Sequence, residues 1–221
     1  MNSTFEHEKL VVGRAAAALV EAGMLLGLGT GSTVNHLLPA LADRALANLR
    51  CVSTSPRTEE AARVLGLAVE PFDPIERLDM AIDGADQVDP EGWLVKGGGA
   101  AHTREKIVAA AAERFVVIIS SDKEVEALGP PVPLELLAFG LESTLHALEH
   151  AKLRDTTPVT PDGGLIADYL GEVGDPKALA LRLDAIPGVV NHGLFTPAMV
   201  SEVLIARGDQ VEHRVVSGGR R

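Results

Sequence analysis

Residues 96–107 read Lys96-Gly97-Gly98-Gly99-Ala100-Ala101-His102-Thr103-Arg104-Glu105-Lys106-Ile107, and the rest of the chain is organised around this stretch. A lysine ends an apolar run, three glycines follow, and a helical pattern with one acid in its first turns comes next. Successive glycines are costly in backbone entropy, so a chain keeps them where the backbone turns sharply or approaches a ligand closely. We therefore expect Lys96 and Glu105 to flank a glycine-lined loop at the start of a rigid helix.

A second polar motif, Asp83-Gly84-Ala85-Asp86, lies upstream of this loop. The intervening Asp89-Pro90-Glu91-Gly92 has proline second and glycine fourth, which favours a type I turn and a hairpin between the flanking runs. Counting outward from the turn places Asp86 near Val95, within about two residues. Two aspartates, one lysine and one glutamate should therefore meet at the glycines, and we expect a site there.

The sequence Gly29-Thr30-Gly31-Ser32-Thr33 joins an apolar strand, 24–28, to a helical pattern over 34–47. Glycines and hydroxyls at the start of a helix suit an anion, because backbone N–H groups and the helix dipole point at it. The dinucleotide fingerprint is not met and no Walker lysine follows, so a small phosphate monoester suits the loop better than NAD or ATP. The alternative is an ordinary helix with a Ser or Thr as its N-cap.

Each predicted strand in the first half of the chain ends in polar residues. These residues are Thr30 to Thr33, Ser53 to Ser55, Asp83 with Asp86, Lys96, and Asp122 with Lys123. The strand at 115–119 is fully apolar, which is typical of a strand buried on both faces of a parallel sheet. In open α/β sheets, ligands bind beyond the carboxyl ends of the strands. The strand ends therefore predict a single crevice that offers hydroxyls, acids and lysines.

The local composition changes after Leu128, where the glycine- and proline-rich segment Gly129-Pro130-Pro131-Val132-Pro133 indicates a domain boundary. Residues 129–195 are predicted to form a small ferredoxin-like α+β domain of order β-α-β-β-α-β. Its expected strands are 132–137, 156–160, 165–169 and 188–195, and its expected helices are 138–152 and 175–186. Residues 1–128 with 196–221 should form the catalytic α/β domain, which has a Rossmann-like open, mostly parallel sheet.

The composition excludes several classes of partner. The chain has 20 Lys and Arg against 31 Asp and Glu, a formal net charge of −11, which argues against nucleic acid as a partner. The single cysteine, Cys51, permits neither an internal disulfide nor a cysteine-rich zinc site. The first residues show no apolar signal core, and no apolar run approaches the roughly 20 residues of a membrane span. We expect a cytoplasmic protein without a membrane partner.

At these motifs the chain resembles the type A family of ribose-5-phosphate isomerases, and Gly193-Leu194-Phe195 is a further match. The resemblance implies interconversion of D-ribose 5-phosphate and D-ribulose 5-phosphate through a cis-enediolate, in the non-oxidative branch of the pentose phosphate pathway. It implies no metal and no organic cofactor. The chain departs from the family's pattern at His102, where an aliphatic residue is expected, and at Asp162-Gly163-Gly164, a turn that often carries asparagines.

The resemblance also implies roles for individual residues. Glu105 becomes the general base that moves a proton between C2 and C1, and Asp83, Asp86 and Lys96 surround the sugar hydroxyls and the developing enediolate. The residues implied in substrate and phosphate binding are Lys9, Thr30, Gly31, Ser32, Thr33, Gly84, Ala85, Gly97, Gly98, Gly99 and Lys123.

Three further expectations concern the surroundings of this site. Glu105 should be ionised at neutral pH, although burial and the two aspartates act to raise its pKa. Arg104 and Lys106 should point away from the face of the helix that carries Glu105, toward solvent or a partner subunit. The small domain makes self-association plausible, and we expect a homodimer or a homotetramer.

The residues alone leave alternatives open. The aspartates and Lys96 could form a structural ion-pair network, or Asp83, Asp86 and Glu105 could bind Mg²⁺, a cation with which Lys96 would compete. An amino-sugar deaminase, a CoA transferase or the sugar-phosphate sensor domain of a transcription regulator could use a similar fold. Formation of a ketose from ribose 5-phosphate in the presence of EDTA separates these functions from an isomerase.

Overall fold

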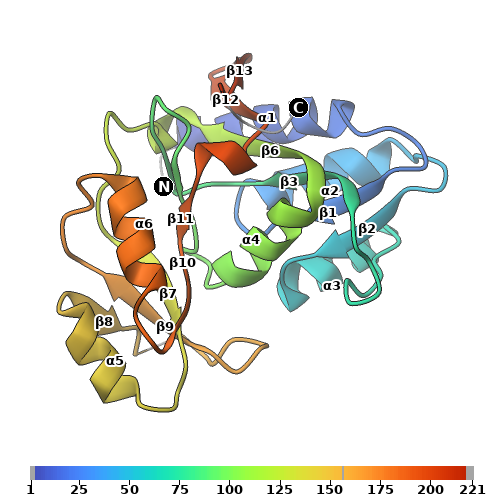
Figure 1. Cartoon of the computed structure of the whole chain (residues 1–221). Helices are drawn as coiled ribbons and strands as arrows, with labels where there is room; N and C mark the ends of the chain where they lie inside the picture. Colours follow the sequence, from blue (N-terminus) through green and yellow to red (C-terminus); the bar gives the residue numbers. More distant parts are fainter. Residues whose placement is uncertain (1–2, 156, 218–221) are drawn as a thin grey trace.

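The computed structural model describes residues 3–155 and 157–217 and contains a large sheet flanked by helices, with a smaller sheet beside it (Figure 1). The large sheet has six strands in the order β13-β12-β6-β3-β1-β2. Their bounds are β1 Leu25–Leu28, β2 Arg50–Ser53, β3 Leu78–Asp83, β6 Ala112–Ser120, β12 Glu202–Arg207 and β13 Gln210–Val215. All neighbours pair in parallel except β12 and β13, so the predicted Rossmann-like open, mostly parallel sheet is confirmed.

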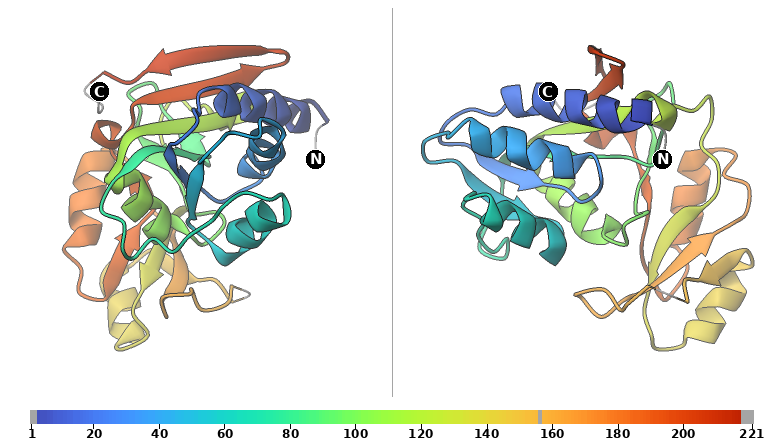
Figure 2. Two further views of the ribbon diagram at one scale, coloured as in Figure 1. Left: turned by 90° about the vertical axis from the view of Figure 1, so that its right-hand side faces the viewer. Right: turned by 180° about the vertical axis from the view of Figure 1, so that it is seen from behind.

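Helices cover both faces of this sheet (Figure 2). The helices are α1 Ser3–Ala18, α2 Val34–Asp43, α3 Pro56–Val64 and α4 His102–Ala111. Because strand side chains alternate between faces, Ile118 packs in the core with α1 and α2, whereas Val117 and Ile119 pack in the core with α4. Every residue from Phe115 to Ser120 is buried, as the apolar run predicts.

The predicted hairpin next to the glycines is present. It consists of β4, Gln87–Val88, and β5, Leu94–Val95, and β11, Leu194–Phe195, extends it to a three-stranded sheet. The turn is fixed by the carboxylate of Asp89, whose Oδ1 accepts hydrogen bonds from the backbone N–H groups of Glu91 (3.0 Å) and Trp93 (2.9 Å). Gln87 pairs with Val95, so the register lies within one residue of the expected one.

The small sheet has the strand order β10-β7-β9-β8, and all its pairs are antiparallel. Its elements are β7 Val132–Leu136, α5 Leu141–Leu148, β8 Ala151–Leu153, β9 Leu165–Tyr169, α6 Pro176–Asp184 and β10 Val189–His192. Numbered along the chain, the strands lie in the order 4-1-3-2, which confirms the ferredoxin-like β-α-β-β-α-β arrangement.

Three predicted elements of residues 129–195 differ from the structure. The second strand is β8 rather than 156–160; residues 157–160 form no strand, and residue 156 lies outside the described residues. The helix predicted to reach 152 ends at Leu148, because Glu149 takes a φ of 58° that interrupts it. The predicted strand 188–195 divides at Gly193 into β10, in the small sheet, and β11, which pairs with β5.

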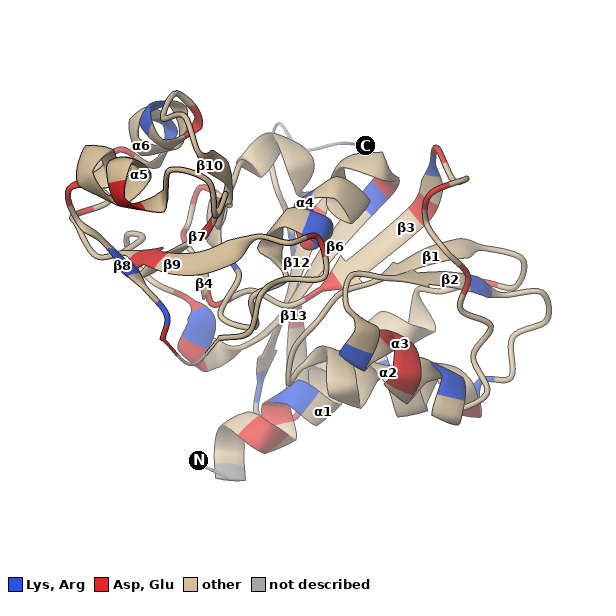
Figure 3. Cartoon of the chain, turned by 90° about the horizontal axis from the view of Figure 1, so that it is seen from below, with Lys and Arg blue, Asp and Glu red and all other residues tan. Residues whose placement is uncertain are grey.

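Acidic and basic side chains are interspersed along the ribbon rather than segregated by sign (Figure 3). Within residues 3–155 and 157–217, no helix combines the length and the apolar character needed to cross a lipid bilayer.

Candidate functional site

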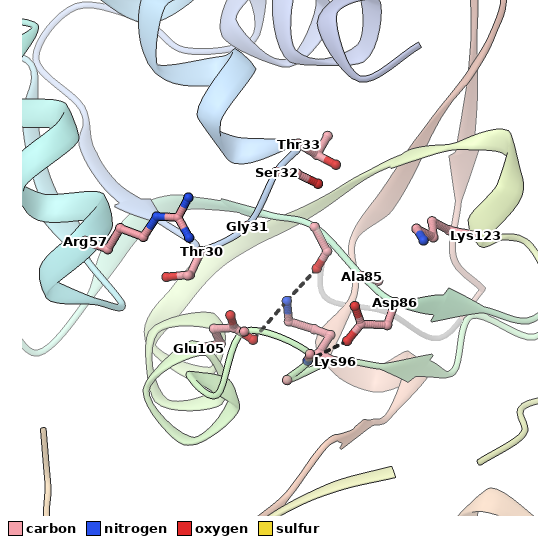
Figure 4. Close-up of a pocket in the computed structure, with 14 residues that line it drawn as sticks. Thr30, Gly31, Ser32, Thr33, Arg57, Ala85, Asp86, Lys96, Glu105 and Lys123 are labelled. Carbon is pink, nitrogen blue, oxygen red and sulfur yellow. Dashed lines mark hydrogen bonds and ion pairs between the residues drawn. The ribbon is translucent and has the colours of Figure 1, made fainter. Parts of the chain in front are cut away.

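A cavity of about 300 Å³ opens beyond the carboxyl ends of the parallel strands (Figure 4). It is lined by Thr30, Gly31, Ser32, Thr33, Arg57, Gly84, Ala85, Asp86, Lys96, Gly97, Gly98, Gly99, Glu105 and Lys123. The lining thus combines the hydroxyl loop after β1, the segment after β3, the glycine loop (Gly97–Gly99) with Lys96, the first turns of α3 and α4, and the segment after β6. The structure thus brings together four of the five predicted strand ends; Ser53 to Ser55, which follow β2, do not line this cavity.

The ammonium group of Lys96 lies between two carboxyl groups. Its Nζ is 2.9 Å from Asp83 Oδ2 and 3.2 Å from Glu105 Oε2, and it donates a hydrogen bond of 2.5 Å to the carbonyl of Gly84. The side chains of Lys96, Asp83 and Glu105 are 2%, 4% and 3% exposed, so water screens their charges very little. One buried cation therefore serves two buried acids.

Asp83 lies behind the cavity rather than in its lining. Its Oδ1 accepts hydrogen bonds from the backbone N–H groups of Thr30 (3.1 Å) and Gly84 (2.7 Å), while its Oδ2 faces Lys96. The chain passes so close that a Cβ on Gly29 would lie 1.9 Å from Asp83 Cγ, which excludes any side chain at position 29. Asp83 thereby ties the hydroxyl loop to the position of Lys96.

Asp86 and the backbone of Lys96 fix the glycine loop from two sides. Asp86 is exposed in the cavity, and its Oδ2 accepts a hydrogen bond of 2.8 Å from the N–H of Gly98. The N–H of Lys96 donates to the carbonyl of Gly193 at 2.9 Å. A Cβ on Gly193 would lie only 2.1 Å from the carbonyl oxygen of Lys96, so this contact requires glycine.

Burial dominates the ionisation of the two acids. It raises the pKa of Glu105 to about 8; the charge of Asp83 adds to this increase and the charge of Lys96 opposes it. Burial also raises the pKa of Asp83, against the opposing effect of Lys96. Burial lowers the pKa of Lys96, but the two carboxylates outweigh it and hold that pKa above its ordinary value. Burial and Asp83 thus oppose the ionised state expected for Glu105 at neutral pH, and Lys96 favours it.

The far side of the cavity carries groups suited to a phosphate. Ser32, Thr33 and Lys123 lie across the cavity from Glu105 (Figure 4). Thr33 is the N-cap residue of α2, but its side chain makes no capping hydrogen bond, so capping does not account for its hydroxyl. The Lys123 side chain is 36% exposed, and its Nζ lies 3.2 Å from Asp122 Oδ2. A helix start, two hydroxyls and a lysine are what a phosphate monoester needs.

The residues that line the cavity differ from the predicted ones at Lys9 and Arg57. Lys9 does not line the cavity; its Nζ pairs with Glu6 Oε1 at 2.7 Å on α1. Arg57, in the first turn of α3, lines the cavity although the sequence analysis missed it. The sequence could have identified Arg57, because the polar run after β2 continues through Ser55 and Pro56 into this arginine.

Arg104 and Lys106 contact the small sheet and its loops within the same chain. Arg104 pairs with Asp162 through two hydrogen bonds, of 2.6 and 2.7 Å. Lys106 Nζ donates to Asn191 Oδ1 at 2.7 Å and to the carbonyl of His192 at 2.6 Å. The expected solvent or subunit contact is therefore wrong for Lys106, which contacts β10, whereas the Arg104 side chain is 36% exposed and pairs with Asp162 at the surface.

Within the part of the chain that the structure describes, no group of three or more His, Cys, Asp or Glu residues is placed to hold a metal ion. His102, the departure from the family pattern, is fully buried beside the glycine loop. Burial lowers the pKa of its imidazole to about 3, so it stays uncharged.

The family model of ribose 5-phosphate isomerase A (phosphoriboisomerase A) matches residues 50–210. A ribose-5-phosphate isomerase A of Methanosarcina acetivorans is 42% identical over 220 residues, covering 94% of this chain and 93% of the relative. The protein of that name from Gluconobacter oxydans is also 42% identical over 220 residues, covering 93% of this chain and 95% of the relative.

Solved structures of ribose 5-phosphate isomerases are also similar to this chain. Ribose 5 phosphate isomerase A from Neisseria gonorrhoeae superimposes with a TM-score of 0.92 at 28% identity, covering 98% of this chain and 100% of that one. A D-ribose-5-phosphate isomerase in complex with phospho-erythronic acid superimposes with a TM-score of 0.90 at 29% identity, covering 97% of this chain and 100% of that one.

Proposed function

The chain belongs to the ribose 5-phosphate isomerase A family and interconverts ribose 5-phosphate and ribulose 5-phosphate, and from this premise we propose that Glu105 moves the proton between C2 and C1. Removing a proton from carbon beside a carbonyl needs a base, together with a cation near the oxygen that gains charge. The observation that supports the assignment is the buried carboxyl of Glu105, 3.2 Å from Lys96 Nζ in the wall of the cavity.

In this proposal the neighbours of Glu105 have distinct tasks. Lys96 stabilises the oxyanion of the cis-enediolate, because a cation in a site with little water acts more strongly than one in solvent. Asp83 holds Lys96, and Asp86, which reaches the cavity, contacts the sugar hydroxyls and accepts or relays a hydroxyl proton. A single carboxylate serves both carbons because C1 and C2 of a cis-enediolate present the same face to it.

We assign the phosphate to the opposite end of the cavity, at Gly31, Ser32, Thr33 and Lys123. The sugar then lies along Thr30 and the backbone of Gly84, Ala85, Gly97, Gly98 and Gly99, which completes the lining. Arg57 adds a further cation at the edge of this cavity. The role of Lys9 in phosphate binding stays a prediction that none of its described contacts supports.

Conversion of ribose 5-phosphate is expected without any added cofactor. Purified protein incubated with ribose 5-phosphate and EDTA should form ribulose 5-phosphate, followed by ketose absorbance or by proton NMR. Exchange of the C2 proton with deuterium from the solvent should accompany the conversion, because the abstracted proton resides on a carboxyl group. Binding of ribose 5-phosphate without any ketose would instead indicate a sugar-phosphate sensor.

The rate is expected to rise with pH through about pH 8. Glu105 accepts a proton only when it is ionised, and its pKa is raised to about 8, so each pH unit below that value should reduce kcat/KM roughly tenfold. Because Asp83, Lys96 and Glu105 interact, the measured value belongs to the cluster as a whole. Initial rates between pH 5.5 and 9.5 test this; a kcat/KM that stays constant down to pH 5.5 would show that Glu105 has an ordinary pKa in the working enzyme.

We further propose the quaternary and domain arrangement. Residues 129–195 form a small domain beside the catalytic domain of 1–128 with 196–221, and the chain assembles as a homodimer or a homotetramer. Large apolar side chains are exposed on the small domain, namely Leu137 (52%), Phe139 (92%), Leu170 (51%) and Leu181 (63%), which supports self-association there. Limited proteolysis tests the domain division, and light scattering gives the number of subunits. We place the enzyme in the cytoplasm, which cell fractionation tests.

A further inference from the structure

The glycine loop carries no side chains that could hold it in place, although Lys96 precedes it directly and Asp86 binds it. Gly97 has a φ of 104° and Ala100 a φ of 62°, so the loop passes twice through left-handed backbone conformations. Ordering three successive glycines costs more conformational entropy than ordering other residues. A defined loop geometry therefore depends on contacts that come from outside the loop.

One such contact comes from the small domain. Arg154 follows β8 directly, and its Nη1 donates hydrogen bonds to the carbonyls of Gly97 (3.3 Å) and Gly98 (3.2 Å). The N–H of Gly98 points the other way, to Asp86 Oδ2 at 2.8 Å. The loop is thus held between an arginine on one side and a residue of the cavity on the other.

The guanidinium of Arg154 is itself held rigidly. Its Nε lies 2.7 Å from Asp168 Oδ2 and its Nη2 lies 2.5 Å from Asp168 Oδ1, a bidentate pair. The two side chains are 19% and 20% exposed, and Asp168 lies on β9, next to β8 in the small sheet. A bidentate carboxylate fixes the plane of a guanidinium. The pair with Asp168 therefore orients the remaining Nη1 of Arg154 toward the glycine loop.

We propose that Arg154 is a positioning residue for the isomerisation. It fixes the glycine loop to the small sheet, and the fixed loop holds Lys96 beside Glu105. This inference rests on the roles proposed above for Lys96 and Glu105. Arginine is required because a single side chain must bind the carboxylate of Asp168 and two loop carbonyls at once. A lysine at this position could satisfy one of these partners but not the fixed geometry of both.

The test compares Arg154→Met with Arg104→Met. Both arginines make a bidentate pair with an aspartate of the small domain, but only Arg154 also reaches the glycine loop. Arg154→Met should lower kcat roughly 10–100-fold with KM changed less than about threefold, because misplacement of a catalytic group affects the transition state more than substrate binding. Arg104→Met should retain the wild-type kcat.

A second readout separates positioning from a general loss of structure. If Lys96 moves away, Glu105 loses the cation that opposes its raised pKa, so the ascending limb of the pH–rate profile should shift to higher pH in Arg154→Met. Arg154→Lys should recover part of kcat and part of this shift, and it replaces Arg154→Met as the informative variant if the latter does not fold.

Wild-type kcat and a wild-type pH profile in Arg154→Met would overturn the inference, as would an equal loss of kcat in Arg104→Met. Asp168→Asn leaves the guanidinium of Arg154 without its carboxylate, and its kcat should lie between those of Arg154→Met and the wild type. An inactive wild-type enzyme would count against the assigned activity rather than against Arg154, so the two failures are distinguishable.

Discussion

Replacement of Glu105 by glutamine is expected to reduce turnover by roughly three or more powers of ten while ribose 5-phosphate still binds. Glutamine keeps the shape of the side chain but cannot accept a proton from carbon. The groups assigned to the phosphate, Ser32, Thr33 and Lys123, lie across the cavity and are unaffected. Isothermal titration calorimetry with ribose 5-phosphate should give a dissociation constant close to the Michaelis constant of the wild type. Near-normal turnover would remove Glu105 from the mechanism.

The same variant should be more stable than the wild type at alkaline pH. The pKa of Glu105 in the folded state, about 8, lies above its ordinary value, so its contribution to stability is present at low pH and is lost as the pH rises toward 8. Glutamine does not ionise and so avoids this loss. In urea unfolding at pH 8.5, the free energy of unfolding of Glu105→Gln should exceed that of the wild type by roughly 1–2 kcal/mol, and at pH 5 the two should be equal. Glu113→Gln, at an exposed glutamate outside the cavity, is the matched control and should change neither rate nor stability.

Replacement of Lys96 by methionine is expected to abolish measurable isomerisation and to lower the free energy of unfolding by roughly 3–5 kcal/mol at pH 8.5. Methionine fills a similar volume but leaves Asp83 and Glu105 buried without the cation that they share. An unpaired buried charge is far more costly than a lost surface ion pair. The oxyanion of the enediolate also loses its counter-charge, so activity falls even where the variant stays folded.

The size of this destabilisation should depend on pH. As the pH falls from 8.5 to 5, the two carboxyl groups, whose pKa values are raised by burial, take up protons and need the cation less, so the stability of Lys96→Met should approach that of the wild type. Urea unfolding at both pH values measures the difference, and the exposed Lys177→Met serves as the control. An equal loss of stability at both pH values would mean that lost packing, not unpaired charge, causes the effect.

Sequence reasoning succeeded where a feature is local. Apolar runs identified β1 and β6 of the large sheet, and the Asp89–Gly92 turn fixed the hairpin register within one residue. The rule that ligands bind beyond the carboxyl ends of parallel strands then brought Asp86, Lys96 and Glu105 into one cavity.

Sequence reasoning failed where the outcome depends on distant partners. The pairing of Lys106 with Asn191 and the reach of Arg154 to the glycine loop both join residues far apart in the sequence, across two sheets. The short strand β8 has no apolar run of its own and follows from its pairing with β9. The ionisation of Glu105 depends on how completely the fold excludes water from a side chain that is 3% exposed, and a local sequence pattern does not reveal this.

The late return of β12 to the large sheet bears on how the protein is made. A ribosome completes every residue of the cavity, from Thr30 to Lys123, long before it releases β12, which pairs in parallel with β6 from Glu202 to Ala206. Until then the apolar strand β6 keeps an open edge, which is the kind of surface that associates with other chains. Nascent chains stalled before residue 202 should therefore depend on chaperones for solubility, although they already contain all the proposed catalytic residues.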